Sequence, residues 1–255
     1  MKIISWNVKQ NNKKIKKLLK FLSSIDADII CLQELPHEAL DYINNYFKDR
    51  HISSTLDFDA KLKSKNTYIC TISKLKPYKY DDFSYYENSV STILNNLFYE
   101  KVRKVKEQHK ALRIFFTIKE KNICVINARL SCAIDPLGRI VQVERLLNYK
   151  CKDSTNIVCG DFNVVSSRFF NRVTGWMRGF NKNDYSLNER EAIEKLFYLN
   201  DFKNTFKDIG TMFVPSKLFQ TDHILVPSST EYSYKEISKK RFGSDHKMIT
   251  LKVRI

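Results

Sequence analysis

The chain has 255 residues, of which 43% are hydrophobic, so it can bury the core of one large α/β domain or of two small ones. Only 6 glycines and 5 prolines are present, which argues against long disordered linkers. The net charge of +16 favours a polyanionic partner such as nucleic acid or an anionic membrane surface, unless a lysine-rich coding bias has merely produced a solvated basic surface.

In the first half of the chain, short apolar, β-branched runs alternate with amphipathic stretches. Such runs predict strands, and apolar residues spaced three or four apart predict helices. The predicted strands are residues 2–8, 28–32, 66–73 and 89–100, and the predicted helices fall at residues 15–22 and 40–47.

In the second half, residues 111–119 and 122–130 are predicted to form a hairpin that turns at Glu120 and Lys121. The remaining predicted elements are helices at 138–150 and 189–199, a strand at 155–159 that stops at Gly160, and strands at 222–226 and 247–255. Strands and helices are interspersed throughout, so we expect a single domain over residues 1–255 with sheet in the middle and helices outside.

The N-terminus has no apolar core typical of a signal peptide, and no segment approaches the roughly 20 apolar residues of a membrane span. The 6 cysteines form no Cys-x-x-Cys pair, and several lie in apolar runs, which is typical of small reduced core residues. We therefore expect a cytoplasmic protein, or a nucleoid or nuclear one if DNA is its substrate. A disulfide-linked secreted domain is the weaker alternative.

Polar side chains cluster where the predicted strands begin or end, and ligand sites gather at such ends because the backbone there is rigid. Taken alone, an aspartate beside a strand is more often a turn former or a helix cap. Hard cations such as Mg²⁺ prefer carboxylate and carbonyl oxygens, which Glu34, Asn7 and Asp245 could supply. A metal-polarised phosphoryl oxygen and an activated water would then carry hydrolysis of a phosphate ester.

The order of these clusters resembles that of the endonuclease–exonuclease–phosphatase superfamily, which has the deoxyribonuclease I-like fold. The matching pieces are Ser5-Trp6-Asn7-Val8, Asp28-Ile29-Ile30-Cys31-Leu32-Gln33-Glu34, Gly160-Asp161-Phe162-Asn163, Thr221-Asp222-His223-Ile224 and Gly243-Ser244-Asp245-His246. The resemblance implies a four-layer α/β/β/α sandwich, in which two mainly antiparallel sheets pack face to face with helices outside. It also implies an active site at one edge and a Mg²⁺ or Mn²⁺ cofactor.

The resemblance assigns roles by position, and the residues that look metal-proximal are Asn7, Glu34 and Asp245. Asp161 resembles the residue that orients or deprotonates the attacking water, assisted by Asn163. His246 resembles the imidazole that contacts the scissile phosphate, with Asp222 orienting its other nitrogen and favouring the cation. An imidazolium there would stabilise the charge that builds on the phosphorane. His223 is expected to be structural, because its side chain should point away from that of Asp222.

Two positions depart from the pattern. Many members of the superfamily carry a His or Tyr on the central strand before the Gly-Asp-x-Asn motif, where this chain has Arg129. Arginine cannot act as a general acid, although it can clamp a phosphate through two donors. Leaving-group protonation would then fall to water or metal, or the activity would be reduced. Lys9 stands where some nucleases have an acidic residue and brings positive charge toward the site, unless it is simply a surface lysine.

The segment 166–183 interleaves arginines with aromatic residues, a pattern that suits phosphate contact and base stacking. The residues predicted to bind substrate are Arg168, Arg172, Trp176 and Arg178. The alternative is that the aromatics are core and the arginines solvated. Basic runs at 101–106, with residues alternating across a strand, and at 239–241 could also track a backbone, or could be solvated faces.

These observations favour a metal-dependent phosphodiesterase that hydrolyses nucleic acid, most readily as a DNA endonuclease or exonuclease. We expect nucleic acid as partner, no stable membrane insertion and a monomer. One alternative keeps the fold but changes the substrate to inositol phosphates, phospholipid headgroups or other small phosphate esters. Another is a nucleic-acid-binding protein with an impaired active site, prompted by Arg129 and Lys9.

Overall fold

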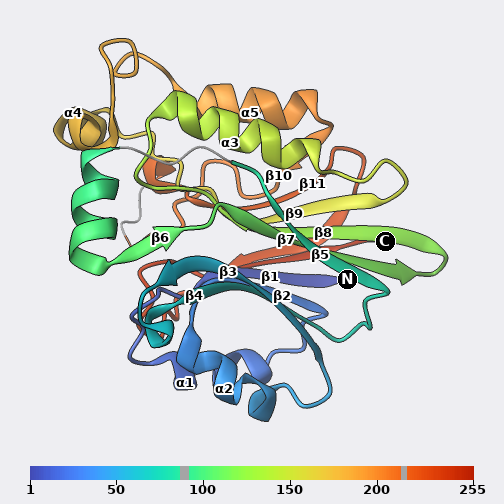
Figure 1. Cartoon of the computed structure of the whole chain (residues 1–255). Helices are drawn as coiled ribbons and strands as arrows, with labels where there is room; N and C mark the ends of the chain where they lie inside the picture. Colours follow the sequence, from blue (N-terminus) through green and yellow to red (C-terminus); the bar gives the residue numbers. More distant parts are fainter. Residues whose placement is uncertain (87–91, 214–216) are drawn as a thin grey trace.

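Two β-sheets stacked face to face form the middle of the molecule (Figure 1). The computed structural model describes residues 1–86, 92–213 and 217–255. The larger sheet has seven strands in the order β12-β13-β1-β2-β4-β3-β6. Its strands are β1 (Lys2–Asn7), β2 (Ile29–Pro36), β3 (His51–Ala60), β4 (Thr67–Ser73), β6 (Val105–Glu107), β12 (Tyr232–Ile237) and β13 (Ile249–Val253).

The smaller sheet has six strands in the order β10-β11-β9-β8-β7-β5. Its strands are β5 (Lys79–Ser84), β7 (Lys110–Ile118), β8 (Lys121–Arg129), β9 (Thr155–Asp161), β10 (Phe202–Asn204) and β11 (Asp222–Pro227). Strands β1 and β2 are parallel, as are β8 and β9, and the other paired strands are antiparallel. Both sheets are therefore mixed but mainly antiparallel.

Helices cover the outer face of each sheet. Figure 1 shows α1 (Ile15–Ser23) and α2 (His37–Tyr46) against the larger sheet, and α3 (Pro136–Asn148) and α5 (Glu189–Leu199) against the smaller one. The apolar stripe of α1 is buried and joins one core with the outward-facing side chains of β1 and β2. A second core lies between the sheets, and a third lies under α3 and α5. The predicted four-layer sandwich is confirmed.

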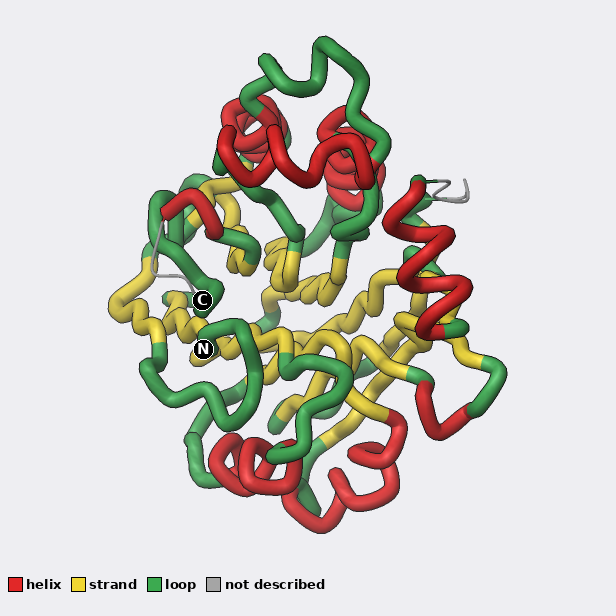
Figure 2. The backbone as a smooth tube through the Cα atoms, turned by 90° about the vertical axis from the view of Figure 1, so that its left-hand side faces the viewer, coloured by secondary structure: helices red, strands yellow, loops and turns green. Residues whose placement is uncertain are grey.

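The shorter helical segments lie at one side of the sandwich. They are the π-helical η2 (Asn95–Arg103), α4 (Arg168–Thr174) and the 3₁₀ turns η1 (Lys63–Lys65), η3 (Gly175–Arg178) and η4 (Lys217–Phe219). Figure 2, which views the molecule from the left of Figure 1, shows helices above and below the strand layers. Within the described residues, no helix is long and apolar enough to cross a membrane.

The strand predicted at residues 89–100 is wrong. Residues 89–91 lie outside the described part of the chain, and the rest of the segment enters η2. Local contacts suit a wide helical turn here, because Asn95 Nδ2 donates to Glu100 Oε1 at 3.0 Å and the Arg103 guanidinium lies over the Phe98 ring. The basic residues 101–103 are therefore helical, and do not alternate across a strand. Lys104, at φ 56°, ends the helix before β6.

Other boundaries differ in smaller ways. Strands β3, β5, β10 and β12 were not predicted, since they are short or carry polar residues on both faces. The hairpin turns at Lys119 and Glu120, whose φ angles of 48° and 66° suit a two-residue turn matching the strand twist. All 6 cysteines are free, and Cys31, Cys70, Cys124 and Cys159 are buried.

Strand β9 continues through Gly160 to Asp161 and does not stop at the glycine. Gly160 has φ 149°, and a Cβ at this position would lie 1.9 Å from the Ala128 carbonyl oxygen. Only glycine lets β9 approach β8 this closely. The close approach places Asp161 directly opposite Arg129 in the parallel pair.

The two sheets are joined by a buried hydrogen-bonded amide. Asn127 of β8 points out of the smaller sheet, and its Oδ1 accepts from Gln33 Nε2 at 2.7 Å. Its Nδ2 donates to the Cys70 carbonyl at 3.0 Å, the Thr71 hydroxyl at 3.2 Å and the Leu32 carbonyl at 3.3 Å. Because Gln33 directly precedes Glu34, this network also holds the end of β2 in place.

Asn127→Ala should therefore lower the free energy of unfolding by about 2–4 kcal/mol, since each buried polar group left unpaired costs about 1–3 kcal/mol. Urea unfolding would measure the loss. Asn122→Ala, an exposed position of the same strand, is the matched control and should change stability by less than about 0.5 kcal/mol. Equal effects of the two changes would contradict the role given to Asn127.

Candidate active site

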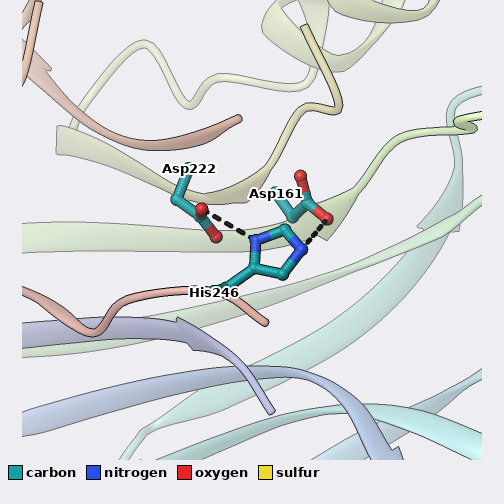
Figure 3. Close-up of side chains that lie close together, drawn as sticks. All are labelled: Asp161, Asp222 and His246. Carbon is teal, nitrogen blue, oxygen red and sulfur yellow. Dashed lines mark hydrogen bonds and ion pairs between the residues drawn. The ribbon is translucent and has the colours of Figure 1, made fainter. Parts of the chain in front are cut away.

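Three polar side chains from different parts of the chain meet where β9 and β11 adjoin the segment before β13. Figure 3 shows the His246 imidazole between the carboxylates of Asp222 and Asp161. Its Nδ1 lies 2.9 Å from Asp222 Oδ2, and its Nε2 lies 3.9 Å from Asp161 Oδ2. The first contact is a hydrogen bond, and the second leaves a gap on the Nε2 side. The predicted Asp222–His246 pair is thus in contact, with Asp161 facing it.

The charges around His246 favour the imidazolium. Burial acts to lower the pKa of His246, but the carboxylates of Asp222 and Asp161 outweigh it and raise the pKa to about 10. The Thr221 hydroxyl donates to Asp222 Oδ2 at 2.9 Å and lies 3.3 Å from Nδ1 of the imidazole. Asp222 is completely buried, so solvent does not weaken its interaction with the His246 imidazolium. At neutral pH His246 is a fixed donor aimed at the gap.

Asp161 is held by donors on both oxygens. Asn7 Nδ2 donates to its Oδ2 at 2.8 Å, and the Asn163 backbone N–H donates to its Oδ1 at 2.9 Å. Asn163 adopts a left-handed φ of 53°, and its own Nδ2 donates to the Leu130 carbonyl at 2.7 Å. Burial raises the pKa of Asp161 to about 6, although His246 opposes the rise. Asp161 can therefore act as an oriented acceptor for a proton near neutral pH.

Of the residues predicted to lie near a metal, two are in contact. Asn7 Nδ2 donates to Glu34 Oε1 at 3.1 Å, and the Gln10 backbone N–H donates to Glu34 Oε2 at 3.2 Å. Glu34 has a left-handed φ of 54°, which turns its side chain toward the site at a break in the β2–β4 register. Asp245 instead faces the Lys9 ammonium at 3.6 Å. Lys9 thus brings positive charge to this group, as the sequence suggested.

Arg129 lies in the site but is not available as a phosphate clamp. Only 2% of it is exposed, and it stacks on Phe58 with 4.3 Å to the ring centroid. Its Nε donates to Asp57 at 3.1 Å, and its terminal nitrogens donate to Glu107 at 2.9 and 2.8 Å and to the Leu130 carbonyl at 3.0 Å. These contacts leave Arg129 a positioning role, which corrects its prediction as a substrate contact.

The surroundings of Arg129 fit a bound cation. Its guanidinium serves Asp57 and Glu107 and also lies 3.8 Å from Glu34, so three carboxylates share one positive charge. Burial outweighs Arg129 and raises the pKa of Asp57 to about 7. Burial acts to raise the pKa of Glu34, but Arg129 and the Asn7 amide outweigh it and hold the pKa of Glu34 below its usual value. Glu34, with 18% of its side chain exposed and excess negative charge behind it, is an ionised carboxylate suited to a hard cation.

Asp161, Asp222 and His246 also lie close enough to hold a metal, with one ligand atom of each within 4.8 Å of the others. Their hydrogen bonds point to a different arrangement. Asp222 Oδ2 already accepts from His246, and the imidazolium leaves no lone pair for a metal. A divalent cation would fit better on the Glu34 and Asn7 side of the site, where carboxylate and amide oxygens are the ligands that hard cations prefer.

The residues predicted to contact substrate divide into two groups. Arg168, Arg172 and Trp176 are exposed on α4 and η3. Arg178 is buried, donates to Asn171 Oδ1 at 2.7 Å and stacks on Phe180, which corrects its prediction as a substrate contact.

His223 is buried between Phe162 and Phe197, and burial lowers its pKa to about 3. A neutral histidine in that position is structural.

An apolar pocket opens beside the site, with a volume of about 500 Å³. Asn163 and Thr221 form its inner wall, and the rest is mainly Phe170, Met177, Met212, Phe213 and Phe219. This pocket, the buried acids Asp57 and Glu107, and the supporting hydroxyl of Thr221 were not found from the sequence. Asp57 lies on the unpredicted strand β3, where alternating polar residues gave no sign of which acid points inward.

The raised pKa of Asp57 predicts how pH acts on stability. The unfolded carboxyl, with a pKa of 3.8, releases its proton before the folded one does. The folded state then binds more protons between about pH 4 and pH 7, so the contribution of Asp57 falls as pH rises through that window. Asp57→Asn should therefore gain stability relative to the wild type as pH rises from about pH 4 to pH 7, as thermal unfolding with a chelator present would measure. Asp59→Asn, exposed on the same strand, should show no such trend.

Comparisons with known proteins agree with the fold. No curated protein is similar enough in sequence to count as a relative. Among solved structures, an endonuclease/exonuclease/phosphatase from Bacteroides vulgatus has a TM-score of 0.70 at 14% identity, covering 100% of this chain and 98% of its own. An AP endonuclease from Archaeoglobus fulgidus has a TM-score of 0.65 at 17% sequence identity. A mannosyl-6-phosphatase from Bacteroides thetaiotaomicron VPI-5482 has a TM-score of 0.65 at 12% identity, and each match covers 100% of both chains.

Such identities show the fold alone. The family is shown by a model of the Endonuclease/Exonuclease/phosphatase family that matches residues 4–246. The chain belongs to the endonuclease/exonuclease/phosphatase family.

Proposed function

We propose that the protein is a divalent-metal-dependent phosphodiesterase that cleaves nucleic acid, with DNA as the preferred substrate. Members of its family are phosphoric ester hydrolases and generally use a divalent metal. The observation that carries the proposal is the imidazolium of His246, held by Asp222 and facing Asp161 across 3.9 Å. A fixed cation opposite an oriented carboxylate suits attack of water on a phosphate ester.

The chemistry divides between the two sides of the gap. Asp161, fixed by Asn7 and by the Asn163 backbone, orients the attacking water and accepts its proton. His246 Nε2 donates to a non-bridging phosphate oxygen and stabilises the charge that grows there. A divalent cation bound at Glu34 and Asn7 would supply Lewis-acid polarisation of the phosphoryl oxygen.

The leaving group needs a proton from elsewhere. Arg129 lies on the strand that points at the site, but a buried guanidinium paired with carboxylates cannot release a proton. We propose that water protonates the leaving group. Esters with good leaving groups should therefore be cleaved faster than those with poor ones.

Three features support nucleic acid as the substrate. The chain carries a net charge of +16, and Arg168, Arg172 and Trp176 are exposed on the helical segment that follows the Gly-Asp-Phe-Asn motif. Arginines beside an exposed aromatic side chain suit backbone phosphates and stacked bases. The solved AP endonuclease from Archaeoglobus fulgidus shows that this fold serves such a reaction.

A small phosphate ester is the second candidate. The apolar pocket beside Asn163 could enclose one non-phosphate group of about 500 Å³, and a mannosyl-6-phosphatase has the same fold. Assays on single-stranded, duplex, abasic and RNA substrates, beside soluble phosphomonoesters, separate the candidates. Phosphate release from the monoesters with inert nucleic acid would select the second.

Asp161→Asn and His246→Ala should each lower kcat/KM on the cleaved substrate by about 10²–10⁴-fold, the usual loss when a general base or a charge-stabilising donor is removed. Steady-state kinetics with Mg²⁺ or Mn²⁺ would measure the effect. Asp49→Asn, an exposed carboxylate away from these contacts, is the control and should be as active as the wild type. Activity that survives both changes would sink the assignment.

Removal of divalent metal by a chelator should abolish activity, and Mg²⁺ or Mn²⁺ should restore it. Glu34→Gln should raise the metal concentration for half-maximal activity by at least about 10-fold, because even outer-sphere partners contribute on that scale. Lys9→Met should lower the metal concentration for half-maximal activity, because it frees Asp245 from its ion pair. Full activity of the wild type in chelator would contradict the cation site.

A further inference from the structure

A second pocket, with a volume of about 260 Å³, lies beside α4 and the start of α5. Two arginines line it, Arg168 from the first turn of α4 and Arg190 from the first turn of α5. Ser166, Tyr185 and Asp208 also line this pocket.

Arg190 is a buried cation with very few partners. Only 14% of its side chain is exposed, yet its guanidinium donates no hydrogen bond to any residue that the structure describes. The nearest opposite charge is Asp208 at 3.8 Å, and 59% of that side chain is exposed. Burial lowers the pKa of Arg190 and outweighs the opposing effect of the carboxylates of Asp208, Glu194 and Glu189.

Another arginine shows what a satisfied partner set looks like in this protein. Arg139 is fully buried and donates to Glu189 at 2.6 Å and to the carbonyls of Ser131, Asn163 and Ile134. Buried arginines normally find such partners, because an unpaired buried charge is costly. The guanidinium of Arg190 therefore has donors to offer to a ligand.

The rest of the pocket is suited to an anion. The Ser166 hydroxyl is enclosed and makes no hydrogen bond to a described residue. Arg168 is exposed and adds a second guanidinium. Glu189 also lines the pocket, and its Oε1 accepts from Arg139 at 2.6 Å, while its Oε2 has no hydrogen-bond partner among the described residues. Two guanidinium groups with spare donors are the recognition chemistry of a phosphate group.

The position of the pocket ties it to the active site. Val165 lines both this pocket and the apolar pocket whose inner wall contains Asn163 and Thr221. The loop from Asn163 to Ser166 therefore connects the catalytic residues to this pocket.

We propose that Arg190 and Arg168, with Ser166, bind a non-scissile phosphate of the same nucleic-acid strand. The inference rests on the proposed nuclease function and adds a second subsite to it. Activity should then depend on strand length, because a substrate too short to place a phosphate in the pocket lacks these contacts.

The test uses the full chain with a nested series of oligothymidylates that differ only in the number of phosphates. In the wild type, kcat/KM should rise by about 10-fold or more at the length that fills the pocket, because a hydrogen bond to a charged group is worth that much. Arg190→Met and Arg168→Met should lose this rise. The log–log salt slope should also become less steep by about 0.7 for each arginine removed, the value for one single-strand phosphate contact.

Lys195→Met is the matched control, because it removes one positive charge from an exposed position of the same helix. It should keep the rise with length. Arg190→Met should melt at or above the wild-type temperature, since it removes an underpaired buried charge. Arg168 is exposed, so its substitution tests the pocket without risk to folding.

Bis(p-nitrophenyl) phosphate, which has no second phosphate, separates this inference from the proposed function. Lys195→Met should hydrolyse it like the wild type. If the wild type hydrolyses it but shows no rise with oligonucleotide length, or if Arg190→Met and Arg168→Met keep that rise, the second subsite is overturned and the phosphodiesterase stands. If the wild type cleaves neither substrate with Mg²⁺ or Mn²⁺, the proposed function itself is overturned.

Discussion

One buried guanidinium holds together the edge of the sandwich on which the site depends. Arg129 ends β8 in the smaller sheet, and its partners Asp57 and Glu107 come from β3 and β6 in the larger one. A third carboxylate, Glu34 of β2, lies within 3.8 Å of it. Arg129, Asp57 and Glu107 are almost fully shielded from water, so solvent does little to offset the excess of carboxylates. A cation at Glu34 would balance it.

A second charge cluster lies on the other side of Asn7. There the His246 imidazolium is the cation, and Asp222 and Asp161 are the anions. Asn7 Nδ2 donates to Glu34 at 3.1 Å and to Asp161 at 2.8 Å, so one amide links the two clusters. A phosphate bound between them would face a donor on one side and a cation site on the other. This division explains how hydrolysis can proceed without a titratable residue at position 129.

The arginines of this chain show how burial decides the role of one residue type. Arg129 and Arg139 are buried with full sets of acceptors and stabilise the fold. Arg178 is buried against aromatic rings. Arg190 is largely buried, has Asp208 at 3.8 Å as its nearest carboxylate and donates no hydrogen bond to a described residue, and together with Arg168 it is assigned to a ligand. A basic net charge cannot tell these roles apart, because it counts every arginine alike.

The sequence by itself determined the elements whose apolar residues repeat with a clear period, such as α1 and the buried strands β1, β2 and β9. It also determined the order of the motifs that contain Asn7, Glu34, Asp161 and His246, because short motifs next to strands survive in the local pattern. Strand β3 and the helix η2 were not predicted. Strand β3 has polar residues on both faces and η2 mixes polar and apolar residues, so neither shows a clear hydrophobic period. Asn7, Glu34, Asp161 and His246, grouped from the sequence, therefore lie next to one another in the structure.

Only the tertiary structure decided what each side chain can do there. From the sequence, Arg129 could be a phosphate clamp, but in the structure its donors are taken by Asp57 of β3 and Glu107 of β6. Arg178 and Arg190 look alike as surface arginines, yet one stacks in the interior and the other lies with its donors unmet at the wall of a pocket. Such roles depend on long-range contacts and on exclusion of water, and neither is present in the spacing of residues along a chain.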